Sequence, residues 1–241
     1  MKRLACVALV CVLAGFCGCG QDEAGSAETT AITTEETAMP TESAPFEYAA
    51  TKRIHGSLPE FTFTLYGQHN NRFPEDHWIT INVIEISGEG FHQRLDGFET
   101  DGPFYPEDYG LTFADFNGDG YLDIQLHKWM GGSMGNEPSL FWLWDNKRQH
   151  FVQNEQLEEI SHENGISMTD DGRLAGYARA GAFGYGVSYY SYINGKFVEV
   201  ERADVHPLDW DDIYNTIFVQ DTYKRINGKM KLVSTEEVDF P

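Results

Sequence analysis

The sequence predicts an all-β fold, a single propeller-like or sandwich-like domain of antiparallel hairpins with little helix. Apolar and polar residues alternate in several short runs with the two-residue period of a strand. Two pairs of such runs are joined by Asn-Gly, the strongest short hairpin signal in a sequence. A third pair encloses an acidic, glycine-containing turn at residues 115–123. The folded domain is expected to span residues 47–241.

Strand patterns recur along this domain. Residues 61–65, Phe-Thr-Phe-Thr-Leu, alternate cleanly, and residues 78–86 are rich in Ile and Val. Residues 140–144, Leu-Phe-Trp-Leu-Trp, are apolar on both faces. A strand that is apolar on both faces is typical of the interior of a packed assembly, so residues 140–144 are expected to form a central strand.

Two hairpins are expected in the C-terminal half, each turning at Asn-Gly. Both share the local sequence Ile-Asn-Gly-Lys, which indicates repeated strand-turn-strand units. Their strands and turns are 189–193, Asn194-Gly195 and 196–200 in the first, and 222–226, Asn227-Gly228 and 229–233 in the second. Helix is expected only at residues 155–160 and 207–218, the second with acidic residues in an early turn.

The turn at residues 115–123 has the form D-x-N-x-D-G-x-x-D. Hard cations such as Ca2+ take six to eight oxygen ligands, and alternate positions of a tight loop can supply them. The side chain of Asp123 would close the shell directly or through a water. Gly120 lies where such a loop turns sharply. The expected ligands are Asp115, Asn117, Asp119, the backbone carbonyl of Tyr121, and Asp123.

The flanks of this loop predict a β-hairpin rather than a helix-loop-helix hand. A full hand carries a bidentate Glu at its twelfth position, where this chain has Leu126. Residues 111–114 and 124–127 alternate with period two. A metal-free turn rich in Asn and Asp is the alternative. If calcium binds, its expected role is structural, because it neutralises carboxylates that would otherwise repel one another.

The N-terminus is typical of an exported lipoprotein. Lys2 and Arg3 precede an apolar stretch that is too short to span a membrane, and residues 1–18 are expected to be a signal peptide. Gly18 precedes Cys19, which is the expected site of lipidation. Palmitate is among the expected lipids. A plain cleaved signal is the alternative. Residues 19–46, mostly Thr, Glu, Ala and Ser, are expected to form a disordered tether.

These features place the domain in the cell envelope, anchored by lipid on the extracytoplasmic side and touching the membrane only through that anchor. All four cysteines lie within the first 19 residues, so the exported domain has no thiol to pair. Disulfides commonly stabilise exported domains, and a bound ion can do so instead. The predicted calcium loop would fill that role.

The charge balance indicates which partners to expect. The chain has 17 Lys and Arg against 38 Asp and Glu, a formal net charge of -21. Such a field repels nucleic acid and favours divalent ions and basic proteins. Two loops are expected to be able to contact a partner, because they combine aromatic and adaptable side chains. Their residues are Trp129, Met130 and Met134 in one, and Phe183 and Tyr185 in the other.

The sequence does not indicate an enzyme. It has no G-x-S-x-G motif, no zinc-type spacing of His and Cys, and no cysteine in the exported domain. A carboxylate pair for hydrolysis could lie among so many acidic residues, so a hydrolase remains an alternative. A cell-surface adhesion or carbohydrate-binding module is another alternative, which the abundant aromatic residues favour.

Several motifs together resemble a known family. They are the lipoprotein signal, the calcium-type loop, Trp142-Leu143-Trp144-Asp145, Leu157-Glu158-Glu159-Ile160-Ser161 and Gly195-Lys196-Phe197. The chain resembles the calcium-binding lipoproteins typified by the Xanthomonas type IV secretion immunity protein. The resemblance implies an FG-GAP-like calcium loop, a propeller-like fold similar to lysozyme inhibitors, and inhibition of a peptidoglycan hydrolase. The implied partner is a basic cell-wall hydrolase or another extracytoplasmic protein.

Overall fold

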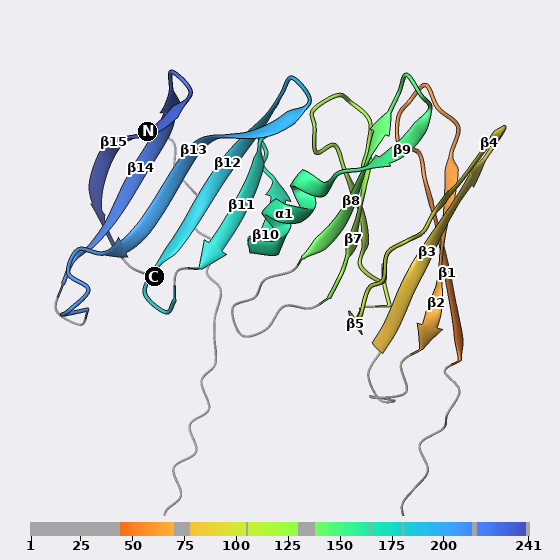
Figure 1. Cartoon of the computed structure of the whole chain (residues 1–241), viewed down its shortest axis with the longest axis horizontal. Coiled ribbons are helices and arrows are strands. Elements are labelled where there is room, and N and C mark those ends of the chain that lie inside the picture. The colour runs from red at the N-terminus through yellow and green to blue at the C-terminus, as the bar shows by residue number, and fades with distance from the viewer. Residues whose placement is uncertain are drawn as a thin grey trace, which may run out of the picture. The chain divides into compact units, whose positions relative to one another are not determined.

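The structure is a computed structural model that describes residues 44–69, 78–104, 106–129, 138–163, 165–179, 181–213 and 216–239. The expected signal peptide and Cys19 lie outside these residues. Within them the fold is three antiparallel sheets and one helix (Figure 1), which confirms the all-β prediction. No helix of the described chain has the length and apolar character needed to cross a bilayer.

The first sheet has the strand order β1-β2-β3-β4, and β5 also pairs with β3. Strands β2 and β3 include the runs predicted at residues 61–65 and 78–86. The bounds are β1 (Pro45–Lys52), β2 (Phe61–His69), β3 (Trp78–Gly88), β4 (Phe91–Leu95) and β5 (Gly102–Pro103).

The second sheet is a meander of four strands in chain order, and the third is a meander of six. The second comprises β6 (Leu111–Ala114), β7 (Asp123–His127), β8 (Ser139–Asp145) and β9 (His150–Gln153). The third comprises β10 (Gly165–Met168), β11 (Leu174–Arg179), β12 (Tyr185–Ile193), β13 (Lys196–Pro207), β14 (Phe218–Ile226) and β15 (Lys229–Val238).

Both Asn-Gly hairpins form as the sequence predicts. Asn194 and Gly195 join β12 to β13 with φ of 51° and 82°, and Asn227 and Gly228 join β14 to β15 with φ of 53° and 79°. Positive φ at both central residues is the type I′ geometry, whose twist matches that of the flanking strands. Glycine and asparagine are the residues that adopt it at least cost.

Strand β8 lies between two apolar cores, as expected for a central strand. Leu140, Trp142 and Trp144 pack in the core that contains the first sheet. Phe141 and Leu143, which point the opposite way, pack with the helix and the third sheet. Because side chains alternate along a strand, a run that is apolar at every position can serve both cores at once.

The helix α1 (Glu155–Glu163) contains the segment predicted at residues 155–160. It follows β9 directly, and Asn154 caps it because its Oδ1 accepts the backbone N–H of Leu157 at 2.9 Å. Leu157 is fully buried in the core shared with the third sheet. Gln156 adds a link to β13, exchanging two hydrogen bonds with the backbone of Phe197.

The prediction of a helix at residues 207–218 is wrong for the residues that the structure describes there. Pro207 ends β13 and pairs with Phe218 of β14, and the described residues between them, 208–213 and 216–217, are not helical. Asp209 Oδ1 accepts the backbone N–H of Asp211 at 2.9 Å. This side-chain bond gives the backbone an alternative to the helical ladder, which is why Asp favours turns.

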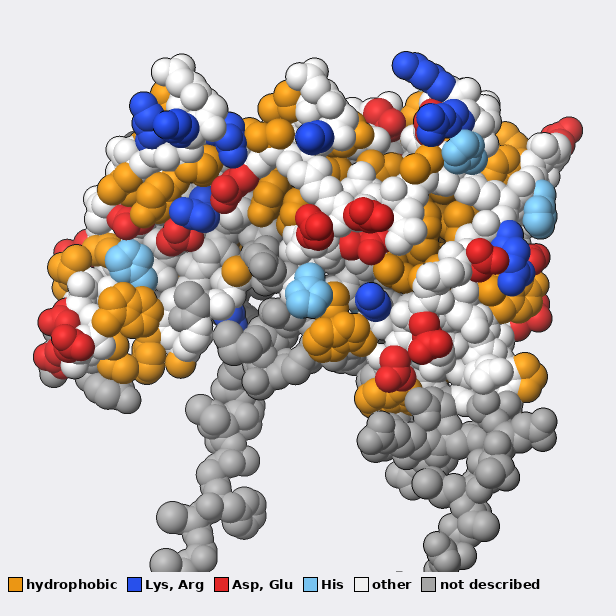
Figure 2. All heavy atoms as spheres, viewed as in Figure 1, with side chains coloured by type: hydrophobic (Ala, Val, Ile, Leu, Met, Phe, Trp, Pro, Cys, Tyr) orange, Lys and Arg blue, Asp and Glu red, His pale blue; other side chains and the backbone are white. Residues whose placement is uncertain are grey.

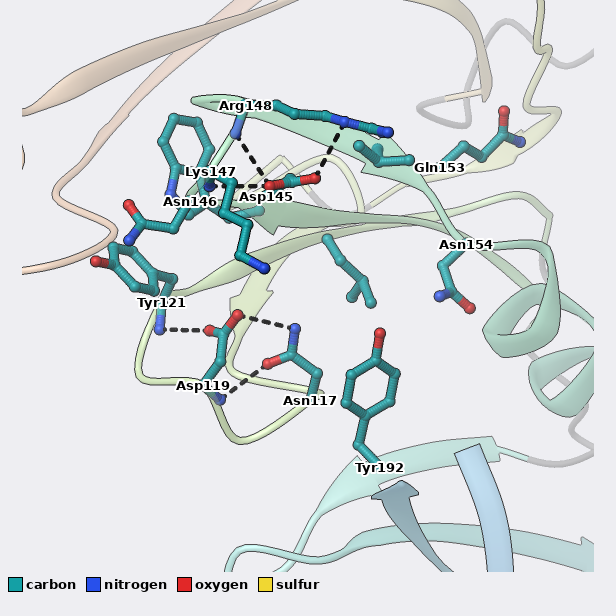
Figure 3. A pocket seen from close by; sticks show the side chains of 13 residues that line it. Asn117, Asp119, Tyr121, Asp145, Asn146, Lys147, Arg148, Gln153, Asn154 and Tyr192 are labelled. Atoms are coloured by element: carbon teal, nitrogen blue, oxygen red, sulfur yellow. Dashed lines mark hydrogen bonds and ion pairs between the residues drawn. The ribbon is translucent and has the colours of Figure 1, made fainter. Parts of the chain in front are cut away.

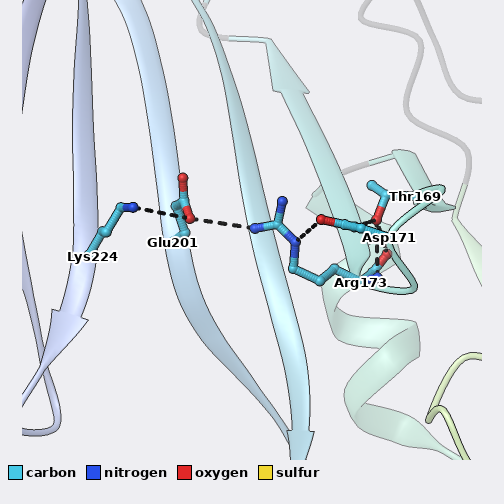
Figure 4. Close-up of polar contacts among 5 residues, drawn as sticks. All are labelled: Thr169, Asp171, Arg173, Glu201 and Lys224. Carbon is cyan, nitrogen blue, oxygen red and sulfur yellow. Dashed lines mark hydrogen bonds and ion pairs between the residues drawn. The ribbon is translucent and has the colours of Figure 1, made fainter.

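Ion pairs cross the third sheet from its first hairpin towards β14 (Figure 4). Arg173 pairs with Asp171 at 2.8 Å and with Glu201 of β13 at 3.5 Å, and Lys224 of β14 reaches Glu201 at 3.8 Å. Thr169 also donates a hydrogen bond to Asp171. Each such pair contributes little to stability alone, and together they connect the first hairpin, β13 and β14 across one face of the sheet.

A histidine on β13 is coupled to a carboxylate on β14. His206 Nδ1 donates to the carbonyl of Pro207 at 2.9 Å, and its Nε2 lies 3.3 Å from Asp221 Oδ2. The Pro207 carbonyl, and then Asp221, raise the pKa of His206, while partial burial opposes the shift. Asp204 on the same strand raises the pKa further. The hydrogen bond from Thr235 lowers the pKa of Asp221, so that this carboxylate stays charged.

We therefore expect this pair to stabilise the fold in acid. A raised folded-state pKa gives stability that is complete below the ordinary histidine pKa of about 6.5 and is lost as pH rises through the folded value. In NMR titration, Asp221→Asn should lower the pKa of His206, whereas Asp170→Asn, an exposed control, should not. An unchanged pKa in the Asp221 variant would contradict the coupling.

Candidate functional site

The acidic loop connects β6 to β7, as the alternating flanks predicted. The two strands pair antiparallel, with Leu111 opposite Leu126 and Ala114 opposite Asp123. The loop is attached at both cores, because Phe116 packs on Phe141 at 5.2 Å between ring centroids and Tyr121 lies 6.5 Å from Trp144. This attachment holds the loop at the junction of the second sheet with its neighbours.

Asp115 organises the first half of the loop. Its Oδ1 accepts the backbone N–H groups of Gly118 and Asp119 at 2.7 and 3.1 Å, and its Oδ2 accepts that of Gly120 at 2.8 Å. Gly118 and Gly120 have φ of 74° and 90°. An added Cβ would meet no atom within 4 Å at either position, so the left-handed backbone, not lack of space, requires glycine there.

The middle of the loop is held by bonds between its own polar groups. Asn117 Oδ1 accepts the backbone N–H of Asp119 at 2.9 Å, and its Nδ2 donates to Asp119 Oδ2 at 3.1 Å. Asp119 Oδ1 accepts the backbone N–H of Tyr121 at 3.0 Å. Side chains at alternate positions therefore turn inward, which is the arrangement that the sequence spacing predicts.

Asp123 is fully buried at the start of β7. Its Oδ1 accepts the backbone N–H of Trp144 at 2.9 Å, and its Oδ2 accepts that of Phe116 at 3.0 Å. Burial raises the pKa of Asp123 to about 8, the two N–H groups oppose the shift, and the charges of Asp119 and Asp115 add to it. The neighbouring charges that raise its pKa are therefore those of other carboxylates in the same loop.

The donor set of the loop fits a hard divalent cation. All five expected ligands offer oxygen, and a carboxylate has about four lone-pair positions, so the backbone bonds leave acceptor capacity. A cation would also remove the repulsion between Asp123 and its neighbours. No group of three His, Cys, Asp or Glu side chains suited to a metal is found in the described residues. Calcium binding, which also uses amide and carbonyl oxygens, stays a prediction.

A groove of about 570 Å³ opens beside the loop (Figure 3), and no sequence motif predicted it. Its walls come from four places in the chain, one of which is residues 152–154 at the end of β9. Asn117 and Asp119 belong to the acidic loop, Lys147 and Arg148 to the β8–β9 turn, and Tyr192 to β12. Hereafter "the groove" means this space. A groove assembled from distant segments leaves no local pattern in a sequence.

The β8–β9 turn presents two cations to the groove. Asp145 Oδ1 accepts the backbone N–H groups of Lys147 and Arg148 at 2.9 and 3.1 Å. These bonds, that of Arg148 first, lower the pKa of Asp145. Gln149 Nε2 donates to the backbone and side chain of Asn146, which closes the turn. The turn is therefore set before any ligand arrives.

Trp144 contributes an unpaired donor to the groove wall. It lines the groove and is 2% exposed, and its indole Nε1 has no acceptor in the described chain. A buried donor without an acceptor costs about 1–3 kcal/mol. Such a group is tolerated where a water or a ligand supplies the missing acceptor.

The structure describes three of the five residues predicted to contact a partner, which are Trp129, Phe183 and Tyr185. Trp129 is 38% exposed and lines a separate cavity of about 360 Å³ with Trp78, Asp101 and Lys128. Tyr185 begins β12 on the third sheet and is 37% exposed. Met130 and Met134 lie outside the described residues, and Phe183 is partly buried in the β11–β12 connection. Their role in partner binding stays a prediction.

The loop between β13 and β14 exposes large apolar side chains that the helix prediction concealed. Leu208, Trp210 and Ile217 are 60%, 57% and 44% exposed. Asp209 and Asp211 lie between them in the same loop. Hereafter "the Trp210 loop" means the described residues 208–213 and 216–217. The pattern Leu-Asp-Trp-Asp-Asp was the available signal, since apolar and acidic residues are mixed without a buried face.

Comparison with known proteins adds evidence on the fold. No protein-family model matches this sequence, and no curated protein matches it. Its fold is similar to that of a solved structure described as "Structure of a Xanthomonas Type IV Secretion System related protein". The TM-score is 0.56 at 17% identity, and the match covers 78% of this chain and 99% of the other. The two proteins are structurally related.

The buried carboxylate and the exposed loop carboxylates should respond differently to amide substitution. In EDTA at about pH 4, near the ordinary Asp pKa, Asp123→Asn should lower the free energy of unfolding by about 1–3 kcal/mol, because the amide can accept only one of two buried N–H bonds. This deficit should shrink as pH rises towards 8, because the wild-type carboxyl, whose pKa is raised to about 8, then costs stability that the amide does not. Asp119→Asn, at an exposed position, should change it by less than about 0.5 kcal/mol. Urea unfolding measures both. Equal, small effects would show that Asp123 does not secure the loop.

Proposed function

We propose that this chain is a calcium-stabilised protein of the cell envelope that is tethered through Cys19 and acts by binding a basic protein. The resemblance in sequence implies that this partner is a peptidoglycan hydrolase, which the chain inhibits. The structural neighbour is described as related to a type IV secretion system, and this description supports a role towards an extracytoplasmic partner. Its fold, not its activity, is what the two proteins share.

The observation that carries this proposal is the Trp210 loop. Exposed tryptophan beside carboxylates is an unusual surface, because large apolar side chains are normally buried and Trp is enriched at binding hot spots. His206 stacks on Trp210 with ring planes 9° apart, which limits the positions the indole can take. The net charge of -21 favours encounter with a basic protein.

Calcium should raise thermal stability. A ligand at 100 times its dissociation constant stabilises a protein by about 2.7 kcal/mol. For a domain of this size the melting temperature should rise by roughly 5–10 °C between EDTA and excess calcium. Scanning calorimetry measures the shift. Asp119→Asn should reduce it, whereas the charge-matched control Asp170→Asn should keep it. An identical melting temperature with and without EDTA would contradict calcium binding.

The Trp210 loop should be required for partner binding. We expect the purified protein to slow cell-wall lysis by at least one member of a panel of basic muramidases and related hydrolases. Trp210→Ala should weaken binding to that enzyme about 30-fold, the loss typical of a hot-spot residue. Leu232→Ala, which removes an equally exposed side chain from β15, should not.

Two results would count against the proposal. If no hydrolase is slowed and calorimetry detects no binding, inhibition is excluded for the panel. If an enzyme is inhibited but Trp129→Ala weakens binding while Trp210→Ala does not, the contact surface is the loop indicated by the sequence. Measurement of the association rate in low and high salt tests the electrostatic part, since screening should slow encounter.

A further inference from the structure

The groove has a composition that the proposed function does not use. Most of its thirteen lining residues are polar or aromatic. Four side chains are planar amides, and the aliphatic residues are few. The amides are Asn117, Asn146, Gln153 and Asn154, and the aliphatic residues are Leu143 and Val152. A purely apolar ligand would therefore leave many polar groups without partners.

Two of these amides keep unused hydrogen-bonding positions. Asn154 uses Oδ1 to cap α1, and Gln153 uses Nε2 to bond Glu158 at 2.8 Å. An amide has two donors and two acceptor positions, so both can bond further groups. Side chains that offer a donor and an acceptor in one plane suit neighbouring hydroxyls, each of which donates and accepts. The tyrosine rings of the groove offer apolar faces beside them.

The cations of the turn select the charge of the ligand. Arg148 Nε is 3.6 Å from Asp145 Oδ2, whereas the ammonium group of Lys147 makes no hydrogen bond or ion pair in the described chain. Figure 3 shows Lys147 extending into the space between the turn and the acidic loop. The groove lining also contains two carboxylates: Asp145 pairs with Arg148, and Asp119 accepts bonds from Asn117 and from the backbone of Tyr121. Lys147 is thus the one charged side chain of the lining that makes no bond in the described chain, and an anion can supply its missing partner.

Further cationic side chains lie on the same side of the sheets as the groove's turn. Lys196 lies at the β12–β13 turn and Lys229 at the β14–β15 turn. Figure 1 places these two turns and the β8–β9 turn on the same side of the sheets. Figure 2 shows Lys and Arg side chains gathered along that side, with acidic side chains mostly below them. An extended anionic ligand would meet positive charge beyond the groove as well.

We propose that the groove binds an acidic saccharide. Lys147 and Arg148 contact a carboxylate of the ligand, the amide side chains bond its hydroxyls, and Tyr121 and Tyr192 pack against its rings. The volume of about 570 Å³ is within the range of small-ligand sites, roughly 300–1,000 Å³. This site is separate from the Trp210 loop, so its existence does not depend on the proposed protein partner.

The test is calorimetric titration of the full protein in constant calcium with trigalacturonic acid, maltotriose and a Glu-rich peptide. We expect trigalacturonic acid to bind more tightly than either of the others. Lys147→Gln should weaken that binding about tenfold or more, the loss expected for a charge-assisted hydrogen bond. Lys231→Gln on β15 is the matched control and should leave the affinity unchanged. Added salt should weaken the wild-type interaction.

Three outcomes would overturn the proposal. They are no binding of trigalacturonic acid, equal binding of the neutral trisaccharide, and equal binding of the peptide. An unaltered affinity in Lys147→Gln would also overturn it, provided that the variant melts at the wild-type temperature. Since Lys147→Gln should still inhibit any hydrolase that the Trp210 loop contacts, failure here is distinguishable from failure of the proposed function.

Discussion

One buried carboxylate connects the acidic loop to the rest of the fold. Asp123 accepts backbone N–H groups from Phe116 in the loop and from Trp144 at the end of β8. Removing a carboxylate from water is costly, and here the neighbouring charges that act on it are also negative. The two N–H bonds offset part of this cost, and protonation or a cation beside the group would offset more of it. Bound calcium would reduce the free-energy cost of burying the Asp123 carboxylate, which is the reason for the calcium proposal.

This constraint extends outward through β8. Trp144 faces the core of the first sheet, while Phe141 and Leu143 of the same strand face the helix and the third sheet. A change at Asp123 therefore acts on the strand that both cores share. Since the β8–β9 turn begins at the end of this strand, the same element positions both the loop and the turn. The groove that these two segments line therefore depends on the position of β8.

Local signals in the sequence were sufficient for most of the sheets. The Asn-Gly pairs, the alternation at residues 61–65 and the doubly apolar run at 140–144 each depend on neighbours in the chain, and each prediction is confirmed. The spacing of the acidic loop also predicted the hairpin that encloses it. The failure at residues 207–218 has a local cause too: the Asx turn at Asp209 outweighed the helical pattern.

The groove could not be predicted because no short segment contains it. Asp145 follows the apolar run at residues 140–144, and no motif in the sequence marks Lys147 or Arg148. Their significance arises only where Tyr192 from a strand more than forty residues further along completes the wall. Tyr121 shows the same limit, since its backbone carbonyl was assigned from spacing while its ring lies on Trp144 and on the groove.

The arrangement of charge explains how one small protein could present two recognition surfaces. The Trp210 loop combines apolar side chains with carboxylates and suits a basic protein, whereas the groove combines amides, two carboxylates and two cations, and its unbonded Lys147 favours an anion. Opposite charge preferences keep a ligand for one surface from competing at the other, because each is repelled where it does not belong. A cation in the acidic loop would strengthen this separation, since it would reduce the negative charge on the wall that faces Lys147 across the groove.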